Sequence, residues 1–295
     1  MLDFVILTED RYENPKNTDW YIKNILEEDG ILLNEISNLG FSVKRVSWSS
    51  KGFDWSSVKY VVFRSTWDYF ERLDEFKRWI KITSKKTKFI NPCSQILWNL
   101  DKSYLNYFKK QGVNIVPSFF ANQNSCLKKI ANDHMWEDVV VKPTISAAAW
   151  NTHLVLKKNL ADFEPTFQNL QKNNNIIVQE FQKNILTFGE VSLVLIGGRY
   201  THAVIKKAKG GDYRVQDDYG GSVERYNPPN EMINFAELII AKCDPRPFYG
   251  RIDVVMDNNN KLALSELELI EPELWFRFNP DSARLLANEL KVLLN

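Results

Sequence analysis

Two apolar runs joined by a polar turn decide the fold of this chain: Gly250-Arg251-Ile252-Asp253-Val254-Val255, Asp257-Asn258-Asn259-Asn260 and Leu262 to Ile270. The polar turn between two such runs predicts a β-hairpin. Side chains of a strand alternate between its two faces, so Arg251 and Asp253 share one face of the first strand. Glu266 and Glu268 share a face of the second strand for the same reason. The pattern therefore predicts three carboxylates and one guanidinium at one end of a sheet.

These carboxylates point to a metal ion. Buried like charges are costly unless a cation neutralises them. Oxygen ligands select a hard cation, and Mg²⁺ commonly binds there together with substrate phosphates. The alternative is a hairpin with a solvated acidic face. We also expect Asp253→Asn or Glu266→Gln to leave the melting temperature of the metal-free protein unchanged or higher, because either change relieves repulsion.

Composition excludes several classes of protein. The 295 residues suffice for two domains, or one domain with subdomains. With 38 basic and 37 acidic side chains, the net charge of +1 favours neither nucleic acid nor a membrane surface as a partner. No apolar run approaches the roughly 20 residues that span a bilayer, and we expect a cytoplasmic location. Three widely spaced cysteines, Cys93, Cys126 and Cys243, fit reduced thiols.

Helical and strand-like segments alternate along the chain, which predicts an α/β (α+β) protein. We expect three units, at residues 1–92, 93–175 and 176–295. The first ends at Asn91-Pro92, because proline and its predecessor resist regular continuation. The third opens with the strand Ile176–Phe181, is mostly strands, and closes with a helix from Asp281 to Leu294.

Basic residues beside small ones suggest contacts to an anion. Lys142 ends an apolar strand and precedes the small-residue loop Ser146-Ala147-Ala148-Ala149, where backbone N–H groups can approach a phosphate. Lys102 by itself is weaker evidence for a phosphate contact. The segment Lys206 to Gln216, flanked by glycine pairs, predicts a mobile flap over a polyanion. The alternatives are a solvated lysine and an exposed basic hairpin.

Together and in this order, these segments resemble the ATP-grasp ligases, in particular the branch shared by D-alanine–D-alanine ligase, glutathione synthetase and the ribosomal-protein glutamate ligases. The resemblance covers residues 93–280 and implies a two-subdomain ATP-grasp fold after an N-terminal α/β substrate domain. It also implies roles for individual residues. These are nucleotide contacts at Lys102, Lys142, Gln179, Glu180, Phe181 and Glu190, catalytic cations at Lys206, Arg214 and Arg251, and metal ligands at Asp253, Glu266 and Glu268.

The chain departs from the family pattern in two places. Family members usually have glycines in the loop after the second lysine, where this chain has Ser146, Ala147 and Ala148. Their Glu-x-Asn metal pair is Glu266-x-Glu268 here, which adds a negative charge. At a finer level, three segments resemble the D-cycloserine synthetase branch, whose members close an O-ureidoserine onto itself. They are Arg64 to Tyr69, Asn91 to Lys102, and Ile270 to Phe276.

The resemblance implies an enzyme that cleaves ATP to ADP and phosphate and forms a C–N bond. Transfer of the γ-phosphoryl group to a carboxylate gives an acyl phosphate, which an amine then attacks. The cofactors implied are ATP and Mg²⁺, with Mn²⁺ and a homodimer left open, and the partners are small-molecule carboxylate and amine substrates. The alternatives are a cyclo-ligase for a ureido amino acid, a ligase acting on a peptide, a kinase-like enzyme, and a nucleotide-binding module without ligase activity.

A substrate site is predicted at the end of a strand in the first unit, at Arg64, Trp67 and Asp68. Ligands of open α/β sheets bind at such edges. Facing it we place Arg251 and the loop Glu271-Pro272-Glu273, so that the substrate would have an anionic and a cationic end. In the alternative, Trp67 and Tyr69 pack a domain interface and Arg64 pairs with Asp68.

Overall fold

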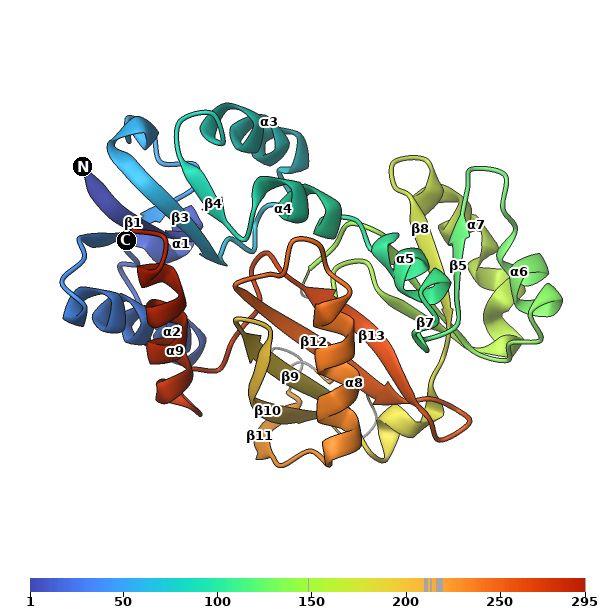
Figure 1. Ribbon diagram of the computed structural model, residues 1–295. Helices are drawn as coiled ribbons and strands as arrows, with labels where there is room; N and C mark the ends of the chain where they lie inside the picture. The colour runs from blue at the N-terminus through green and yellow to red at the C-terminus, as the bar shows by residue number, and fades with distance from the viewer. Residues whose placement is uncertain (148, 210–211, 213, 216–219, 295) are drawn as a thin grey trace.

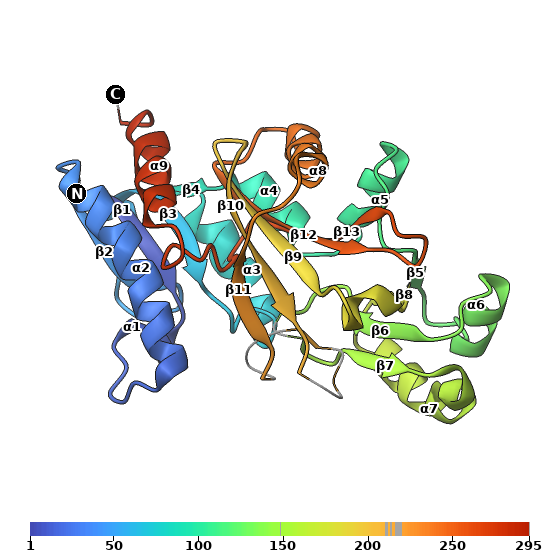
Figure 2. The ribbon, with the colours of Figure 1, turned by 90° about the horizontal axis from the view of Figure 1, so that it is seen from below.

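The computed structural model describes residues 1–147, 149–209, 212, 214–215 and 220–294. Three sheets lie side by side, with the five-stranded sheet between the other two in both views (Figures 1 and 2). The predicted α/β (α+β) class is confirmed. No helix in the described part of the chain is long and apolar enough to cross a membrane.

The N-terminal sheet is parallel and has the strand order β2-β1-β3-β4. Its elements are β1 (Leu2–Thr8), α1 (Asp10–Glu13), α2 (Trp20–Asn38), β2 (Val43–Ser47), β3 (Val58–Ser65), α3 (Leu73–Thr83) and β4 (Lys88–Ile90). Both faces of β1 are covered, which explains its continuous apolar run. Phe4 and Ile6 pack with helix α2, whereas Val5 and Leu7 pack with Phe76 of helix α3.

The second sheet is antiparallel and has the order β5-β8-β6-β7. The segment that builds it comprises α4 (Cys93–Asn99), α5 (Tyr104–Lys110), β5 (Ser118–Ala121), α6 (Leu127–Asp133), β6 (Val139–Pro143), β7 (His153–Val155), α7 (Leu160–Gln171) and β8 (Ile176–Glu180). Strand β8 lies in this sheet, between β5 and β6, although the sequence grouped it with the strands that follow. The three predicted domain boundaries therefore stay predictions.

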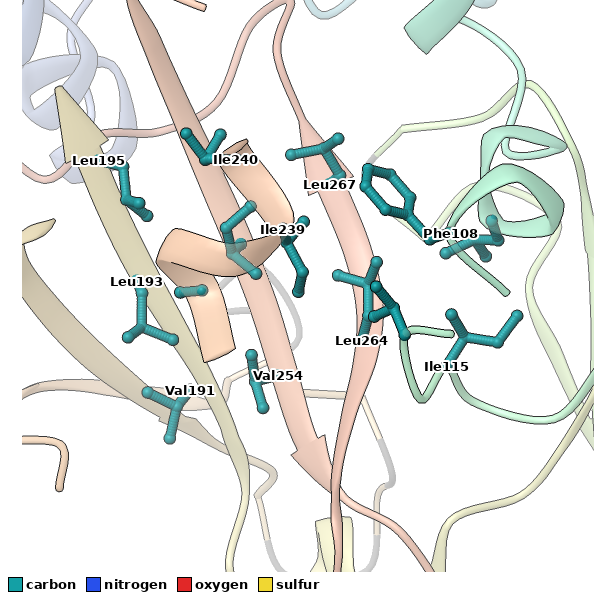
Figure 3. Close-up of a cluster of buried hydrophobic side chains, with 14 of the residues drawn as sticks. Phe108, Ile115, Val191, Leu193, Leu195, Ile239, Ile240, Val254, Leu264 and Leu267 are labelled. Atoms are coloured by element: carbon teal, nitrogen blue, oxygen red, sulfur yellow. The ribbon is translucent and has the colours of Figure 1, made fainter. Parts of the chain in front are cut away.

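The five-stranded antiparallel sheet has the order β11-β10-β9-β12-β13. It contains β9 (Glu190–Ile196), β10 (Arg199–Lys207), β11 (Ser222–Tyr226), β12 (Tyr249–Met256) and β13 (Leu262–Glu268), with α8 (Asn230–Ala241) on one face. Figure 3 shows Ile239 and Ile240 of α8 packing on Leu193 and Val254 of the sheet. The predicted hairpin is confirmed as β12 and β13, which pair antiparallel.

The last helix, α9 (Pro280–Lys291), leaves this sheet and packs against α2 of the N-terminal unit (Figures 1 and 2). Leu286 and Leu290 of α9 join Leu32 and Ile36 of α2 in one buried cluster. His202 of β10 contacts the carbonyl oxygen of Leu274 at 2.9 Å, which ties the sheet to the segment that leads to α9.

Two buried asparagines fasten the β12–β13 hairpin to the N-terminal unit: Asn91 follows β4, and Asn99 lies in α4, which packs on that unit through Ile96. The Asn91 amide nitrogen donates to the carbonyl oxygens of Tyr249 at 2.9 Å and Leu269 at 2.8 Å, and its oxygen accepts from the Phe248 N–H at 2.7 Å. Asn99 donates to the Leu267 carbonyl and accepts from the Leu269 N–H. These bonds fix the N-terminal sheet next to the strands that carry the predicted site.

Replacement of Asn91 with alanine should lower the free energy of unfolding by about 3 kcal/mol, since it leaves three buried backbone groups without partners. Chemical denaturation of the purified variant measures this. Asn124→Ala, at an exposed loop position, is the matched control and should stay within about 0.5 kcal/mol of the wild type. Equal stabilities of the two variants would contradict the role assigned to Asn91.

Candidate active site

A cavity of about 270 Å³ opens where the three sheets meet. Its wall includes most of the predicted site residues: Trp67, Lys102, Lys142, Gln179, Glu180, Phe181, Glu190, Lys206, Arg214, Arg251, Asp253, Glu266 and Glu268. These residues come from segments up to two hundred positions apart in the chain. The cavity is therefore a product of the tertiary fold.

Cross-strand register gathers the charged side chains on one face of the five-stranded sheet. Asp253 of β12 lies opposite Ser192 of β9 and Glu266 of β13. Arg251 lies opposite Glu268, and Lys206 of β10 lies opposite Glu190. The alternate side chains of the same strands pack under α8. One face of the sheet is thus apolar, and the other carries the charges.

The charges are paired across the strands. Arg251 donates from Nε to Asp253 at 2.9 Å and from Nη2 to both Asp253 and Glu268. Lys206 lies 3.3 Å from both Glu190 and Asp253, and Ser192 donates to Asp253 at 2.6 Å. Among the described residues, Arg251 Nη1 has no hydrogen-bond partner, so this nitrogen can serve a ligand.

Lys102 and Lys142 approach the cluster from the second unit. Lys102 donates to the Ser146 carbonyl at 2.7 Å and lies 3.0 Å from Glu266. Lys142, at the end of β6, is half-buried, and its side chain makes no hydrogen bond or ion pair with the described residues. Burial, together with the nearby charge of Lys102, lowers the pKa of Lys142. The loop residue Ala148 lies outside the described residues.

The three acidic residues predicted as metal ligands differ electrostatically. Burial opposes ionisation of Asp253, but Arg251 and Lys206 hold the pKa of that carboxyl well below its usual range. Lys102 and Lys142 likewise outweigh burial and lower the pKa of Glu266. Burial and the neighbouring carboxylates raise the pKa of Glu268 to about 8, despite its contact with Arg251.

This difference corrects the expectation that Asp253→Asn or Glu266→Gln leaves the melting temperature of the metal-free protein unchanged or higher. Removing a charge relieves repulsion only where the neighbouring acids outweigh the neighbouring bases. At Glu268, burial and the neighbouring acids together outweigh Arg251 and raise the pKa, but at Asp253 and Glu266 the basic side chains dominate. Neutralising Asp253 or Glu266 should therefore cost stability in the metal-free protein rather than preserve it.

Apolar side chains from strands β6, β12 and β13 and from the segments around Val116, Phe181 and Ile185 also line the cavity. They are Val116, Val140, Phe181, Ile185, Val255 and Leu267. The backbone of Phe181 is already engaged, because its N–H donates to the Asp138 carbonyl and its carbonyl accepts from the Asn258 side chain. Gln179 donates to Ser118 at 2.9 Å, and the Glu180 carbonyl accepts from the Gln182 side chain. These apolar side chains suit an aromatic ring.

The predicted substrate residues are not all in the cavity. Trp67 lines it, and its Nε1 donates to the Glu271 carbonyl at 2.9 Å. Arg64 lies outside it, donating to the Pro272 carbonyl at 2.7 Å. Asp68 also lies outside it and accepts from Trp48 at 2.7 Å and Arg72 at 3.0 Å. Arg64 and Asp68 therefore support the wall and do not pair with each other.

Part of the predicted flap is described. Arg214 lines the cavity and donates from Nη2 to Asp212 at 2.7 Å. Gly210, Gly211, Tyr213 and Gln216, which carried the rest of this prediction, lie outside the described residues.

Sequence reasoning missed several residues of the site. Tyr21, Tyr69 and Gln182 line the cavity, and the Trp275 ring lies beneath Arg251 at 5.1 Å and Lys206 at 6.0 Å. Ser192 could have been found, because it shares a strand face with Glu190. Tyr21 carries no local signal, since only tertiary packing brings helix α2 to this site.

Comparisons with known proteins agree with this geometry. Residues 4–91 match the family described as D-cycloserine synthetase DcsG, N-terminal domain. The chain is 26% identical to the cycloserine biosynthesis protein DcsG of Streptomyces lavendulae, over 88% of this chain and 91% of that protein. The crystal structure of D-cycloserine synthetase DcsG matches with a TM-score of 0.84 and 25% identity, covering 99% of this chain and 100% of that one.

A more distant similarity extends to the ATP-grasp ligase PsnB, solved with a precursor variant, Mg and ADP. The TM-score is 0.65 at 14% identity, covering 100% of this chain and 99% of PsnB, which shows the shared fold. The chain shares the ATP-grasp fold, and its similarity to DcsG supports an ATP-dependent ligase.

The donor set of the cavity fits a magnesium ion held jointly with phosphates. No three acidic, histidine or cysteine side chains in the described part of the chain form a ready-made metal shell. Glu266 and Glu268 line the cavity and are half-buried, whereas both oxygens of Asp253 are already bonded. Mg²⁺ usually takes one or two carboxylates together with substrate phosphates, and Glu266 and Glu268 supply such a pair.

Two isosteric variants should separate repulsion from pairing in the metal-free protein at pH 7. Glu268→Gln removes a carboxylate that its surroundings disfavour, so the melting temperature should hold or rise. Asp253→Asn leaves Arg251 and Lys206 without their shared anion and should cost about 3 kcal/mol. Thermal unfolding in the presence of a chelator measures both. A lower melting temperature for the Glu268 variant than for the Asp253 variant would refute this assignment of charges.

Proposed function

We propose that this chain is an ATP- and Mg²⁺-dependent carboxylate–amine ligase that activates a small amino-acid-like carboxylate as an acyl phosphate. The observation that carries the proposal is the shared cavity. Two lysines from the second unit, the charged face of the β12–β13 hairpin and an aromatic wall from the N-terminal unit enclose the same volume. Such an arrangement can hold a nucleotide, a metal and a small substrate together.

ATP would lie with its base at the apolar end near Phe181 and its phosphates toward Lys102 and Lys142. Lys142 supports this orientation because its side chain lines the cavity and makes no bond with the described residues. A magnesium ion held by Glu266 and Glu268 would neutralise phosphate charge during transfer. Glu190, next to Lys206, supplies a carboxylate for the ribose hydroxyls.

The chemistry then needs no protein nucleophile. The γ-phosphoryl group passes to a substrate carboxylate oxygen, which yields ADP and an acyl phosphate. An amine attacks the acyl carbon, the C–O bond to phosphate breaks, and the amine loses its proton. Arg251 would bind the substrate carboxylate and then the tetrahedral oxyanion through Nη1, while Nε and Nη2 keep it anchored to Asp253. Lys206 and Arg214 add positive charge beside the reacting groups.

The size of the substrate follows from the N-terminal unit. Trp67 and Tyr21 close the cavity on the side of that unit, and their ring centroids lie 6.1 Å apart. The same unit matches the N-terminal domain of D-cycloserine synthetase. Both observations favour a small amino-acid derivative, and O-ureidoserine in particular, over a peptide. With that compound the ligation would be intramolecular.

Replacement of Lys142 with alanine should weaken ATP binding by about 1.5–3 kcal/mol, the usual value of a hydrogen bond to a charged group. Calorimetric titration with a non-hydrolysable ATP analogue and Mg²⁺ measures the effect. Lys109→Ala, at an exposed position of α5, is the matched control and should bind like the wild type. An unchanged affinity in the Lys142 variant would remove Lys142 from the phosphate site.

The reaction class is tested by measuring ADP release with a panel of small amino acids and O-ureidoserine. A ligase should release ADP and phosphate only with a substrate present, and hydroxylamine should trap the acyl phosphate as a hydroxamate. A kinase would give ADP with a stable phosphorylated product and no hydroxamate. If no small amino acid or ureido derivative stimulates ATP cleavage, the proposal of a small substrate fails, and a peptide carboxylate takes its place.

A further inference from the structure

One buried carboxylate in the cavity wall has no cationic partner. Glu271 lines the cavity and is only 7% exposed. No lysine, arginine or histidine nitrogen in the described part of the chain lies within 4.0 Å of its carboxylate. By contrast, Glu190, Asp253, Glu266 and Glu268 each have a lysine or arginine partner. A buried charge without a partner costs stability, so Glu271 requires another explanation.

The surrounding contacts hold Glu271 in place. The Tyr69 hydroxyl donates a hydrogen bond to its carboxyl group, and Tyr69 is itself buried. Trp67 donates to its backbone carbonyl at 2.9 Å. Burial raises the pKa of Glu271 to about 7. An ionised carboxylate can accept about four hydrogen bonds, so Tyr69 leaves room for further donors.

Glu271 acts electrostatically on the residues at the proposed reacting end of the site. The negative charge of Glu271 helps to raise the pKa of Glu268. Glu268 in turn contacts Arg251. The aromatic side chains of Trp67 and Tyr21 line the same cavity. Aromatic rings next to a carboxylate suit a cation, because the faces of the rings are also electronegative.

We propose that Glu271, held by Tyr69, binds the ammonium group of an amino-acid substrate whose carboxylate lies at Arg251. This inference rests on the proposed function and narrows it to substrates that keep a free, charged amino group. An ammonium group has no lone pair and cannot attack the acyl phosphate. The new C–N bond therefore forms at a different nitrogen, and the amino group bound by Glu271 is retained in the product.

The test compares two probes that differ only in this group: O-ureidoserine and its desamino analogue, 3-(ureidooxy)propanoate. In the wild type, kcat/KM for ADP release should favour the amino compound by about tenfold or more, as expected for one charged hydrogen bond. Glu271→Gln keeps the shape of the side chain and should abolish most of that preference, with the KM for ATP unchanged. Tyr69→Phe should reduce the preference in part.

Glu273→Gln is the matched control, because Glu273 lies in the same wall and its charge is already paired with Arg277. This variant should keep the preference for the amino compound. Wild-type turnover without such a preference, or a preference that survives in Glu271→Gln, overturns the role of Glu271 and leaves the proposed function standing. If the wild type releases no ADP with either probe or with any small amino acid, the proposed function and this inference both fail.

Discussion

The structure depends on the burial of opposite charges in alternation on one face of a sheet. Arg251 and Lys206 lie among the carboxylates of Glu190, Asp253 and Glu268, and each ion costs several kcal/mol to remove from water. An opposite charge nearby offsets much of this cost. Strands β9, β10, β12 and β13 provide this order because their cross-strand register sets acids beside bases. The apolar face beneath α8 holds that register in place.

A charged face of this kind becomes a site only when other units enclose it. Asn91 and Asn99 bond the backbone of the β12–β13 segment to the N-terminal unit. Helix α9 returns from the sheet to α2 and joins the same two units from the other side. The N-terminal unit can therefore place Trp67 and Tyr21 against the cavity. These contacts attach the aromatic wall of the cavity to the strands that carry the charges.

The sequence predicted what depends on short-range periodicity. The hairpin of β12 and β13, its polar turn and the shared face of Arg251 and Asp253 follow from a period of two, and the structure has all of them. Features that depend on distant partners were missed. Strand β8 pairs with β5 and β6, and nothing within its own residues specifies that choice. The sequence shows how many charges there are but not how they pair, so repulsion was expected at Asp253, where two cations dominate.

Lys142 and Glu271 line the cavity without an ionic partner in the described part of the chain. Lys142 is half-buried and lines the cavity from the second unit, and Glu271 is buried in the wall near the N-terminal unit. Each lowers the stability of the fold relative to a neutral or paired residue. Functional sites often keep residues that lower stability because activity requires them. The two charges are opposite in sign and come from different units. The two charges would thus suit a phosphate beside one unit and a cation beside the other, as the proposed ligase for ATP and an amino acid requires.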